Sequence, residues 1–509
     1  MKKILLFIFL FVYADADAQI NDTKRDNIWL LGYSQPLGAN GKIDSSYDNS
    51  IINFAIKPTK AKRQTMDMFL RDDIAIISDT TGKLLFYTNG IYIADATHQP
   101  MLNGKGLNPG KEADKEAKYG YILPQGSLIL PKPENTDLYY LIHSSTIFDA
   151  VNVPNDYKGE KLYYTLIDMS KNNGKGEVIE KNKVIIGNKF VDIGKITACR
   201  HANGKDWWII VADFNNKILN ILLLDANGIK ISKKIAFSEG GKDGGGGQAV
   251  FSPDGTKYAR LNIHSIFQTE LSLFDFDRCN GVLSNQKYLQ INNDTTYAGG
   301  IAISPNSKYA YISSFQKIYQ LDLTKDDVFS TIDTVAIYDG FIDPYVGVST
   351  SFYLEQLAPD GKIYISIPSS SKYLHVIHEP DKKGKACNVE QHGFKLAGIN
   401  YTTMPNFPNF RLGKAAQPCT VGTEDEVEKE NIKIYPNPAQ TELHLDIPLL
   451  ATDIAEISII SLTGAQIVRK NNLNTNNLLD ISSLQNGLYL CYVYKNNVLF
   501  ATQKLIILK

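Results

Sequence analysis

The sequence predicts an all-β protein, in which a β-propeller of about seven blades is followed by a small Ig-like β-sandwich. A turn phrase recurs every 52 to 54 residues, and short runs rich in Tyr, Ile, Phe and Val fill the intervals. Such runs suit pleated sheets, and no segment shows long helical periodicity. After Gly413 the composition changes and a separate set of short strands begins. These observations predict two β domains joined by a linker.

The turn phrase is clearest at Phe251–Tyr258, where Ser, Pro, Asp and Gly supply the chemistry of a tight β-hairpin turn. It returns at Ile303–Tyr309 and at Leu357–Tyr364, each time followed by an apolar alternating run. The prolines of the three copies are 52 and 54 residues apart. A repeat of that length is typical of a propeller blade with about four short strands.

Six predicted hairpin turns mark the blades, at Gly82, Thr136, Gly204, Gly255, Ser307 and Gly361. Their spacings are 54, 68, 51, 52 and 54 residues, and the long interval indicates an insertion. The 387 residues from Asn27 to Gly413 give about seven blades at roughly 50–55 residues each. We therefore assign residues 19–413 to the propeller. Because an open ring would expose sheet edges, we expect the N-terminal strand run to join the last blade.

The end of the chain reads as a linker and a second domain. Residues 414–429 contain a proline, a glycine and the acidic run TEDEVEK without an apolar period, which is typical of a linker. Residues 430–509 contain seven short strand candidates separated by turn signals. This pattern predicts a small β-sandwich.

The first 18 residues have the features of a secretory signal peptide. Two lysines precede an apolar run at residues 4–13, and a small-residue box follows at residues 16–18. We expect cleavage between Ala18 and Gln19. A ten-residue apolar run is too short to cross a bilayer, and no other segment approaches 18 uninterrupted apolar residues. The sequence thus predicts an exported protein without a transmembrane segment.

The charge balance indicates which partners are not expected. Lys and Arg number 53, Asp and Glu number 54, and the formal net charge is −1. A protein without a basic surplus has no broad attraction for nucleic acid or for an anionic membrane. We therefore expect no nucleic-acid partner.

Five cysteines in an exported chain permit disulfides without forming a dense framework. The odd number leaves at least one cysteine unpaired. Cys387 and Cys419 flank the end of the propeller, and we single them out as one candidate pair. Cys491 lies in the strand run LYLCYVY, and we expect it to be a buried thiol. No Cys/His cluster has zinc-binding spacing.

The last 80 residues resemble a known sorting domain. The residues that carry the resemblance are Tyr435, Pro436, Asn437, Pro438, Gly464, Gly487, Tyr489 and Lys509, within the runs IYPNPAQTELHLDI, LTG and LQNGLYLCYV and the basic end of the chain. This set resembles the type A C-terminal sorting domain of the type IX (Por) secretion system of Bacteroidetes. The resemblance implies contact with the type IX machinery and export to the outer cell surface or the extracellular space. It further implies removal of the domain, with release or attachment to surface lipopolysaccharide.

The propeller region resembles a less informative group. Phrases such as ISDTTGKLLFYTNG, RHANGKDWW and MPNFPNFRLG are similar to secreted propeller proteins of the same bacteria. The repeat also resembles WD-type and Tol-type propeller repeats. The resemblance covers most of residues 27–413 and transfers no catalytic residue.

Asp275 and Asp277 are the candidate metal ligands. They alternate in FDFDRCNG, so both carboxylates lie on one face of a strand end and could help to bind calcium. The alternative is a turn in which Asp277 and Asn280 cap their own backbone. The twelve-residue calcium loop is absent, and capping is the favoured interpretation. We assign no metal and no cofactor to the chain.

Three further patterns have structural alternatives that we favour. The run Gly240–Gly247 could hold an anion, but it lacks the ending of a phosphate-binding loop and reads as a loop between blades. His375 and His378 are three residues apart on a strand, so they point to opposite faces and suit a shared metal poorly. Trp207 and Trp208 are adjacent; both read as packing residues, although one could be a sugar-stacking platform.

Three functions remain open at this stage. The first is a binding module that recognises glycan or protein through one face of the ring, because no catalytic signature is evident. The second is a secreted hydrolase or lyase acting on polysaccharide or peptide, with a site assembled in the channel from distant blades. The third is a structural or adhesion component of the cell surface. Groups converging in the channel would favour the second, and apolar patches on the rim would favour the third.

Overall fold

The computed structural model describes residues 22–34, 45–149, 156–214, 217–236, 246–265, 268–292, 299–417, 419, 433–447, 455–461, 466–495 and 498–509. The chain forms two compact units, residues 1–419 and residues 420–509. The boundary lies within the predicted linker 414–429. Each unit is described by itself.

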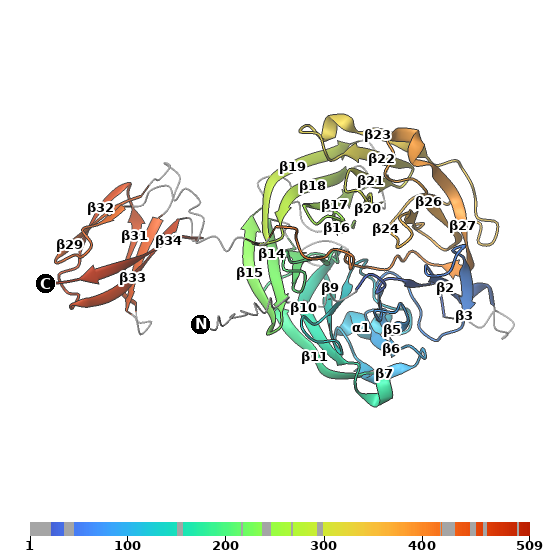
Figure 1. Cartoon of the computed structure of the whole chain (residues 1–509), viewed down its shortest axis with the longest axis horizontal. Helices are drawn as coiled ribbons and strands as arrows, with labels where there is room; N and C mark the ends of the chain where they lie inside the picture. Colours follow the sequence, from blue (N-terminus) through green and yellow to red (C-terminus); the bar gives the residue numbers. More distant parts are fainter. Residues whose placement is uncertain are drawn as a thin grey trace, which may run out of the picture. The chain divides into compact units, whose positions relative to one another are not determined.

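The first unit is a ring of seven antiparallel sheets (Figure 1). Blade 1 has three described strands, β1 (Ile28–Leu31), β2 (Asn49–Asn53) and β3 (Ala61–Gln64). Blade 2 comprises β4 (Ala75–Ser78), β5 (Leu84–Thr88), β6 (Tyr92–Asp95) and β7 (Pro100–Lys105). Blade 3 comprises β8 (Ser127–Pro131), β9 (Leu138–Asp149), β10 (Asp156–Asp168) and β11 (Glu177–Ile186). One parallel residue pair, Leu102 with Glu177, joins these two sheets.

The remaining four blades each have four strands in chain order. Blade 4 comprises β12 (Thr197–Arg200), β13 (Trp207–Ala212), β14 (Ile218–Asp225) and β15 (Gly228–Ala236). Blade 5 comprises β16 (Ala249–Phe251), β17 (Lys257–Ser265), β18 (Gln268–Asp277) and β19 (Val282–Asn292). Blade 6 comprises β20 (Gly299–Ile303), β21 (Tyr309–Ser314), β22 (Lys317–Asp322) and β23 (Asp333–Ile337). Blade 7 comprises β24 (Glu355–Leu357), β25 (Ile363–Ile365), β26 (Ser371–Ile377) and β27 (Val389–Asn400). One short helix, α1 (Lys111–Glu116), and the 3-10 turns Ser45–Tyr47, Asn172–Gly174, Phe329–Thr331 and Gly384–Cys387 lie in connections.

The six predicted hairpin turns all occur, and each joins the first strand to the second strand of one of blades 2–7. The repeated chemistry explains the repeated geometry. In blade 5 the Gly255 N–H donates to the Ser252 carbonyl (2.8 Å), and Gly255 adopts a φ of 73°. In blade 7 the Gly361 N–H donates to the Ala358 carbonyl (3.0 Å), again with a positive φ. Glycine adopts this conformation without steric cost, so the turn recurs wherever the phrase recurs.

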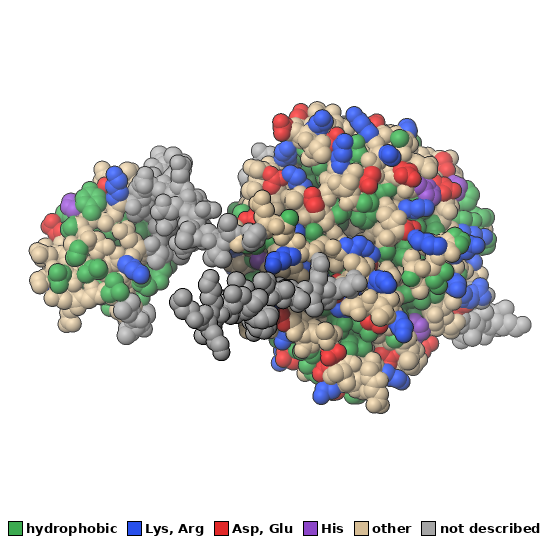
Figure 2. All heavy atoms as spheres, in the orientation of Figure 1, with side chains coloured by type: hydrophobic (Ala, Val, Ile, Leu, Met, Phe, Trp, Pro, Cys, Tyr) green, Lys and Arg blue, Asp and Glu red, His purple; other side chains and the backbone are tan. Residues whose placement is uncertain are grey.

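Burial follows the position of a strand in its blade. Every residue of the first two strands of blade 4, β12 and β13, is buried, whereas the outer strand β15 has no buried residue. Inner strands are covered by neighbouring blades on both faces, so they are mostly apolar, and polar members such as Arg200 of β12 are buried with them. On the face shown in Figure 2, basic and acidic side chains are interspersed over the ring without a continuous field of one sign.

The ring closes differently from the sequence-based expectation. The N-terminal strands form their own sheet, β1-β2-β3, and do not join the sheet of the last blade, β24-β25-β26-β27. Blades 1 and 7 instead contact each other directly, since the N–H groups of Ala397 and Gly398 in β27 donate to the Ser50 hydroxyl in β2 (3.1 and 3.0 Å). Residues 401–413, which we call the C-terminal strap, cross the centre of the ring in Figure 1. Phe407 of the strap lies against Trp29 of β1, with ring centroids 6.3 Å apart. The expectation was wrong because the edges are protected by packing and by the strap.

The disulfide also differs from the pair singled out from the sequence. Cys279 bonds to Cys419, with their Cα atoms 5.4 Å apart. Cys387 is buried as a free thiol, so the predicted pair Cys387–Cys419 does not form. The residues after the strap pass over blades 4 and 5, where the Ala415 N–H donates to the Ala202 carbonyl (2.9 Å). This path brings Cys419 to the turn after β18, and the propeller unit therefore extends beyond Gly413.

The second unit is a β-sandwich of seven strands, as predicted. One sheet has the order β28 (Lys433–Tyr435), β29 (Glu442–Asp446), β32 (Asn476–Asp480), and the other has the order β31 (Gln466–Leu473), β30 (Ala455–Ser461), β33 (Gly487–Lys495), β34 (Val498–Ile507). Alternating residues of both sheets share one core, which includes Leu443, Ile457 and Val493. Cys491 is buried in that core, as expected.

Candidate functional site

The candidate site lies at one end of the propeller channel. Because neighbouring strands of a blade are antiparallel, the turns between first and second strands all emerge on one face of the ring. The connections between blades emerge on the other face. Three of the repeated turns place a proline on the first face, at Pro253, Pro305 and Pro359, and these prolines line a common cavity.

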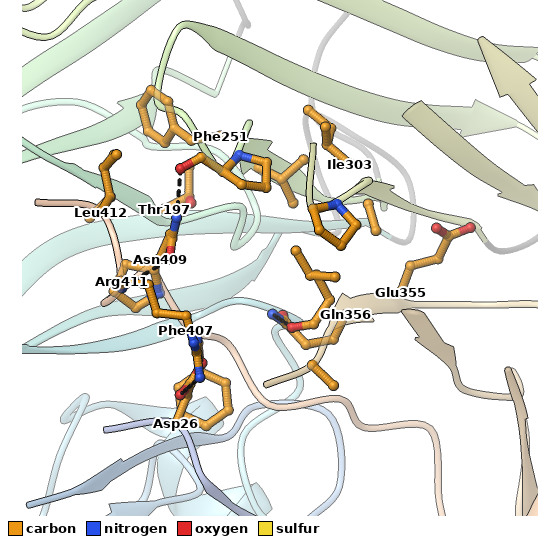
Figure 3. Close-up of a pocket in the computed structure, with 18 of the residues that line it drawn as sticks. Asp26, Thr197, Phe251, Ile303, Glu355, Gln356, Phe407, Asn409, Arg411 and Leu412 are labelled. Carbon is orange, nitrogen blue, oxygen red and sulfur yellow. Dashed lines mark hydrogen bonds and ion pairs between the residues drawn. The ribbon is translucent and has the colours of Figure 1, made fainter. Parts of the chain in front are cut away.

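This cavity has a volume of about 540 Å³ and is shown in Figure 3. Inner strands and turns of blades 4–7 supply most of its lining, the strap supplies a further part, and Asp26 and Gln125 complete it. The apolar lining residues include Ala198, Ala249, Val250, Phe251, Ala302, Ile303, Leu357, Ala358, Phe407, Pro408 and Leu412. A cavity of this size and character is typical of sites for small, largely apolar ligands.

The strap is held in place by buried amides. The Asn406 side chain donates to the carbonyls of Ser127 (3.0 Å) and Ile196 (2.9 Å), in blades 3 and 4. Its backbone N–H donates to the Ile74 carbonyl in blade 2 (3.2 Å). Gln125 donates to the Asn406 amide oxygen (3.2 Å). One residue thus connects three blades, and the strap fills their side of the channel.

The strap also connects the two ends of the propeller chain. Arg411 donates to both carboxylate oxygens of Asp26, at 2.6 and 2.8 Å, and this ion pair lines the cavity. Nearby, the buried carboxylate of Asp22 accepts hydrogen bonds from Arg25 and Arg200. A bidentate Arg–carboxylate pair fixes both partners in one geometry, so the cavity wall is well defined.

Most polar side chains at the cavity are already paired. Asn409 donates to the Pro253 carbonyl (2.6 Å) and accepts from the Arg411 N–H (3.0 Å). Asp254 accepts from the Ser252 hydroxyl (2.6 Å) and so caps its own turn. Gln356 donates to the Leu357 carbonyl (3.1 Å). Groups that already have partners are poorly suited to exchange protons with a ligand.

Glu355 is the buried carboxylic acid of this region. Figure 3 shows its carboxyl group pointing away from the other lining side chains, and the Ser313 hydroxyl of blade 6 donates to it. Burial raises the pKa of Glu355 to about 8, and the hydrogen bonds from Ser313 only partly oppose this effect. At neutral pH the group is therefore mostly an uncharged acid between two blades.

A second, charged cluster lies towards the other end of the channel, at the connection between β11 and β12. Asp192, Lys195 and Arg260 are each less than 5 % exposed. Asp192 accepts from Arg260 at 2.5 Å and lies 3.1 Å from the Lys195 ammonium. Burial lowers the pKa of Lys195 to about 8, against the opposing effect of Asp192. Buried charges of this kind are costly and recur at functional sites, as well as in structural networks.

The structure places the calcium candidates in local contacts. Asp275 accepts from Lys257 and from Asn285 (2.7 Å), while Asp277 accepts from the Cys279 N–H (2.8 Å) and from the Asn280 side chain (2.8 Å). Burial acts to raise the pKa of Asp275, but the hydrogen bonds from Lys257 and Asn285 outweigh it and lower the pKa. Within the described residues, no three His, Cys, Asp or Glu side chains gather as metal ligands.

The other patterns from the sequence have structural roles. His375 is fully buried and accepts from the His392 N–H (3.0 Å), whereas His378 bonds to Glu390 (2.6 Å) at the surface. Trp207 and Trp208 are both buried, so neither is an exposed platform. Residues 18, 19, 464 and most of the glycine-rich run at 240–247 lie outside the described residues, as do their predicted roles.

Within the second unit, the sorting-domain residues converge on the terminal strand β34. Asn437, between Pro436 and Pro438, donates to the Lys504 carbonyl (2.7 Å) and accepts from the Ile506 N–H (2.8 Å). Asn486, beside Gly487, accepts from the Lys509 N–H (2.7 Å). Tyr489 donates to the Gln485 carbonyl (2.9 Å), and Tyr435 stacks on His444. Two motifs that are distant in sequence thus hold the same strand.

Sequence reasoning did not find the strap or the cavity. The available signal was the run MPNFPNFRLG, whose polar and apolar residues alternate with prolines outside any strand. Such a run reads as a loop unless its partners are known. Those partners are distant in sequence, since Asn406 and Gln125 are 281 residues apart.

Comparison with known proteins identifies the second unit. Residues 433–508 match the family described as the secretion system C-terminal sorting domain. These residues are a type IX sorting domain, which implies interaction with the type IX machinery and an outer-membrane, surface or secreted location. No curated protein matches the chain. Among the described residues, no helix has the length and apolar character to cross a membrane.

Solved structures similar to the chain are propellers of low sequence identity. A candidate 6-phosphogluconolactonase from Bacteroides uniformis is 12% identical with a TM-score of 0.37, covering 94% of this chain and 100% of that one. The periplasmic gluconolactonase of Pseudomonas aeruginosa is 10% identical with a TM-score of 0.37, covering 74% and 100%. TolB from Acinetobacter baumannii is 14% identical with a TM-score of 0.26, covering 62% and 64%. None of these similarities carries an activity over to this chain.

Proposed function

We propose that this protein is an exported binding module whose propeller takes a small, largely apolar ligand into the cavity at the proline-lined end of its channel. The sorting domain supports export. Cleavage of the predicted signal peptide is tested by N-terminal sequencing of the mature protein, which should give Gln19 as the first residue. The ligand is either a free apolar molecule or an apolar group attached to a glycan or a protein, and the cavity binds that apolar part.

The pairing of the cavity's polar side chains carries this proposal. Asn409, Asp254 and the Arg411–Asp26 pair are already hydrogen-bonded, and the carboxyl group of Glu355 is directed towards blade 6. A sugar entering the cavity would leave many hydroxyl groups without partners, which costs free energy for each desolvated group. An apolar ligand has no such cost and gains from leaving water.

The test is binding of an uncharged fluorescent probe, N-phenyl-1-naphthylamine, to the purified full chain. Gln356 projects among the lining side chains in Figure 3 and is half-buried, so it offers a matched pair of variants. Gln356→Trp should fill the cavity and weaken binding by about tenfold or more, whereas Gln356→Ala should leave binding equal or tighter. Equal binding by both variants would place the probe elsewhere and refute the proposal.

A second candidate function is a hydrolase or lyase acting on polysaccharide or peptide. The buried cluster of Asp192, Lys195 and Arg260 favours it, because the lowered pKa of Lys195 would let this amine exchange a proton near neutral pH. Incubation with polysaccharide and peptide libraries, scored for product release, tests this alternative. Activity that Lys195→Met abolishes, while the fold is retained, would establish the enzyme. Silence in both the binding and the release assays would leave a structural or adhesion role.

A further inference from the structure

A second surface feature lies on the opposite face of the propeller from the cavity. The connection from β23 to β24 joins blades 6 and 7 and carries Tyr345, whose side chain is 48% exposed. Two lysines of blade 7 flank this ring. The ammonium of Lys372 is 4.4 Å from the ring centroid and that of Lys395 is 4.8 Å from it. Lys395 also donates to the Tyr345 hydroxyl at 2.6 Å.

The connection is held firmly in this position. Asp343 is fully buried, and its carboxylate accepts from the N–H groups of Tyr345 (2.8 Å) and Lys372 (2.7 Å) and from the Ser371 hydroxyl (2.6 Å). The Asp343 N–H donates to the Val348 carbonyl (2.9 Å), which closes the loop on itself. Tyr345 and both lysines are therefore pre-organised, and a ligand would not have to order them.

The charge at this position is only partly balanced. In the described part of the chain, Lys372 is 9% exposed and makes no hydrogen bond through its ammonium, which instead lies against the Tyr345 ring. The hydrogen bond from Lys395 and the charges of both lysines lower the pKa of Tyr345. Two ammonium groups sharing one ring repel each other, and an anionic group between them would relieve that repulsion.

Further rings widen the surface around Tyr345. Tyr373 lies 6.4 Å away between ring centroids, and Phe341 contacts Tyr373 at 5.5 Å. His392 stacks on Phe341 at 4.0 Å and bonds to Asp339 (3.0 Å). Tyr345 is the exposed ring of this surface, the other three rings are half-buried, and of the two lysines Lys395 is exposed while Lys372 is largely buried. Such a surface suits a polymer that lies across it, because exposed rings contact the apolar faces of sugars while the lysines contact acidic groups.

We propose that Tyr345, Lys372 and Lys395 form a binding site for an acidic polysaccharide, that is, a glycan bearing carboxylate or sulfate groups. The site is separate from the channel cavity. Lysine is a point charge without the planar geometry of arginine, so either anionic group would be accommodated. The two anion types are separated by the choice of polymer in the test.

The test is affinity electrophoresis of the purified full chain through gels containing polygalacturonate, dextran sulfate or neutral dextran. Retardation by one or both acidic polymers, and none by neutral dextran, is expected at about 0.15 M salt. Lys372→Met/Lys395→Met should weaken binding by about tenfold or more, and Tyr345→Phe, which keeps the ring but removes the bond to Lys395, should weaken it less. Because Lys372 is largely buried, the single variant Lys395→Met is tested as well, and unchanged melting of each variant would show that it folds.

Lys308→Met is the matched control for Lys395→Met, because the Lys308 ammonium also lies over a tyrosine ring, at 5.2 Å from the Tyr309 centroid, and each substitution removes one positive charge. It should bind like the parent protein. Equal weakening by Lys308→Met and by Lys395→Met would mean that net charge alone acts, and would overturn the proposal. Absence of retardation by either acidic polymer would overturn it as well.

Discussion

The propeller and the C-terminal unit differ in how the edges of their β-sheets are protected. In the propeller, the strap lies inside the ring against Trp29, and Arg411 pairs with Asp26 of the N-terminal segment. In the C-terminal unit, β34 pairs with β33 on one side. On its other side, Asn437 and Ala439 hydrogen-bond the backbone from Lys504 to Leu508, whereas Val498–Gln503 has no described strand partner there. Closed edges suit a domain that must not pair with other sheets. An open edge suits one that is recognised by another protein through added strand pairing.

The side chains of β34 reinforce this comparison. Leu505 and Ile507 are buried in the sandwich, whereas Ile506 and Leu508 are about half exposed. The outward face at the end of the chain therefore carries Ile506 and Leu508 beside the exposed Lys504. The propeller buries most of its large apolar residues between blades, although some on its outer strands, such as Val184, Ile231 and Ile337, are exposed. We propose that recognition during export and recognition of a ligand are assigned to different units.

The largest expected effect comes from removing the open-edged unit. A chain that lacks Glu430–Lys509 should fold its propeller but remain in the periplasm, because the sorting signal is gone. Cell fractionation and a blot for the propeller measure this outcome. If the truncated chain is found outside the cell in the same proportion as the full chain, the C-terminal unit does not direct export.

The next largest effect concerns the disulfide, which lies in the propeller unit. The Cys279–Cys419 bond closes a loop of 140 residues within the propeller unit. Loop-closure entropy predicts that Cys279→Ser/Cys419→Ser costs about 5 kcal/mol of propeller stability. Calorimetry should show a lower melting transition for the propeller and an unchanged one for the sandwich. Reducing agent should have no further effect on this variant, and equal shifts of both transitions would contradict the assignment.

The strap itself should account for a somewhat smaller effect. Asn406→Ala removes the donor to the carbonyls of Ser127 and Ile196 and leaves both buried without it. Unsatisfied buried groups cost about 1–3 kcal/mol each, so we expect a loss of about 3 kcal/mol. Asn409→Ala, which removes one partly buried bond to Pro253, is the control and should cost about 1 kcal/mol. Chemical denaturation measures both, and equal costs would mean that Asn406 does not organise the channel.

These contacts show where sequence reasoning succeeded and where it could not. The hairpin turns and the sorting motif are local: the residues from Ser252 to Gly255 make the turn by themselves, so the pattern predicts the structure. The strap and the disulfide are not local. Arg411 and Asp26 are 385 residues apart, and nothing in either short stretch specifies the other. The cavity depends on four blades and the strap together, so it could not be read from any one motif.

A pH effect should appear in the propeller and not in the sandwich. The pKa of Glu355 is about 8 in the folded protein, whereas an unfolded Glu has a pKa of about 4.3. Because the folded state favours the protonated acid, this stability is fully present below about pH 4 and is lost as the pH rises through 8. Buried Asp73, with its pKa raised by burial to about 7, acts in the same direction.

We therefore expect the propeller transition to weaken between pH 5 and pH 9, by a few kcal/mol from Glu355. Melting curves across this range measure the slope for each transition. Glu355→Gln should show a shallower slope, since the amide does not ionise. Parallel slopes for the parent and the variant would show that Glu355 does not titrate with folding.

The smallest effect concerns how the open edge is kept in register. Asn437→Ala removes the side chain that bonds the Lys504 carbonyl and the Ile506 N–H, and exposed bonds of this kind contribute about 1 kcal/mol together. The sandwich should still fold, with a slightly lower melting transition, but β34 should be less firmly held. Export should then fall further than the stability loss explains. Asn477→Ala, which removes the bonds of this side chain to the Leu445 carbonyl and to the Asn474 backbone in the other sheet, is the control for stability alone. If both variants are exported equally, the position of β34 is not what the export machinery recognises, and the contrast between a closed propeller and an open sorting edge loses its functional meaning.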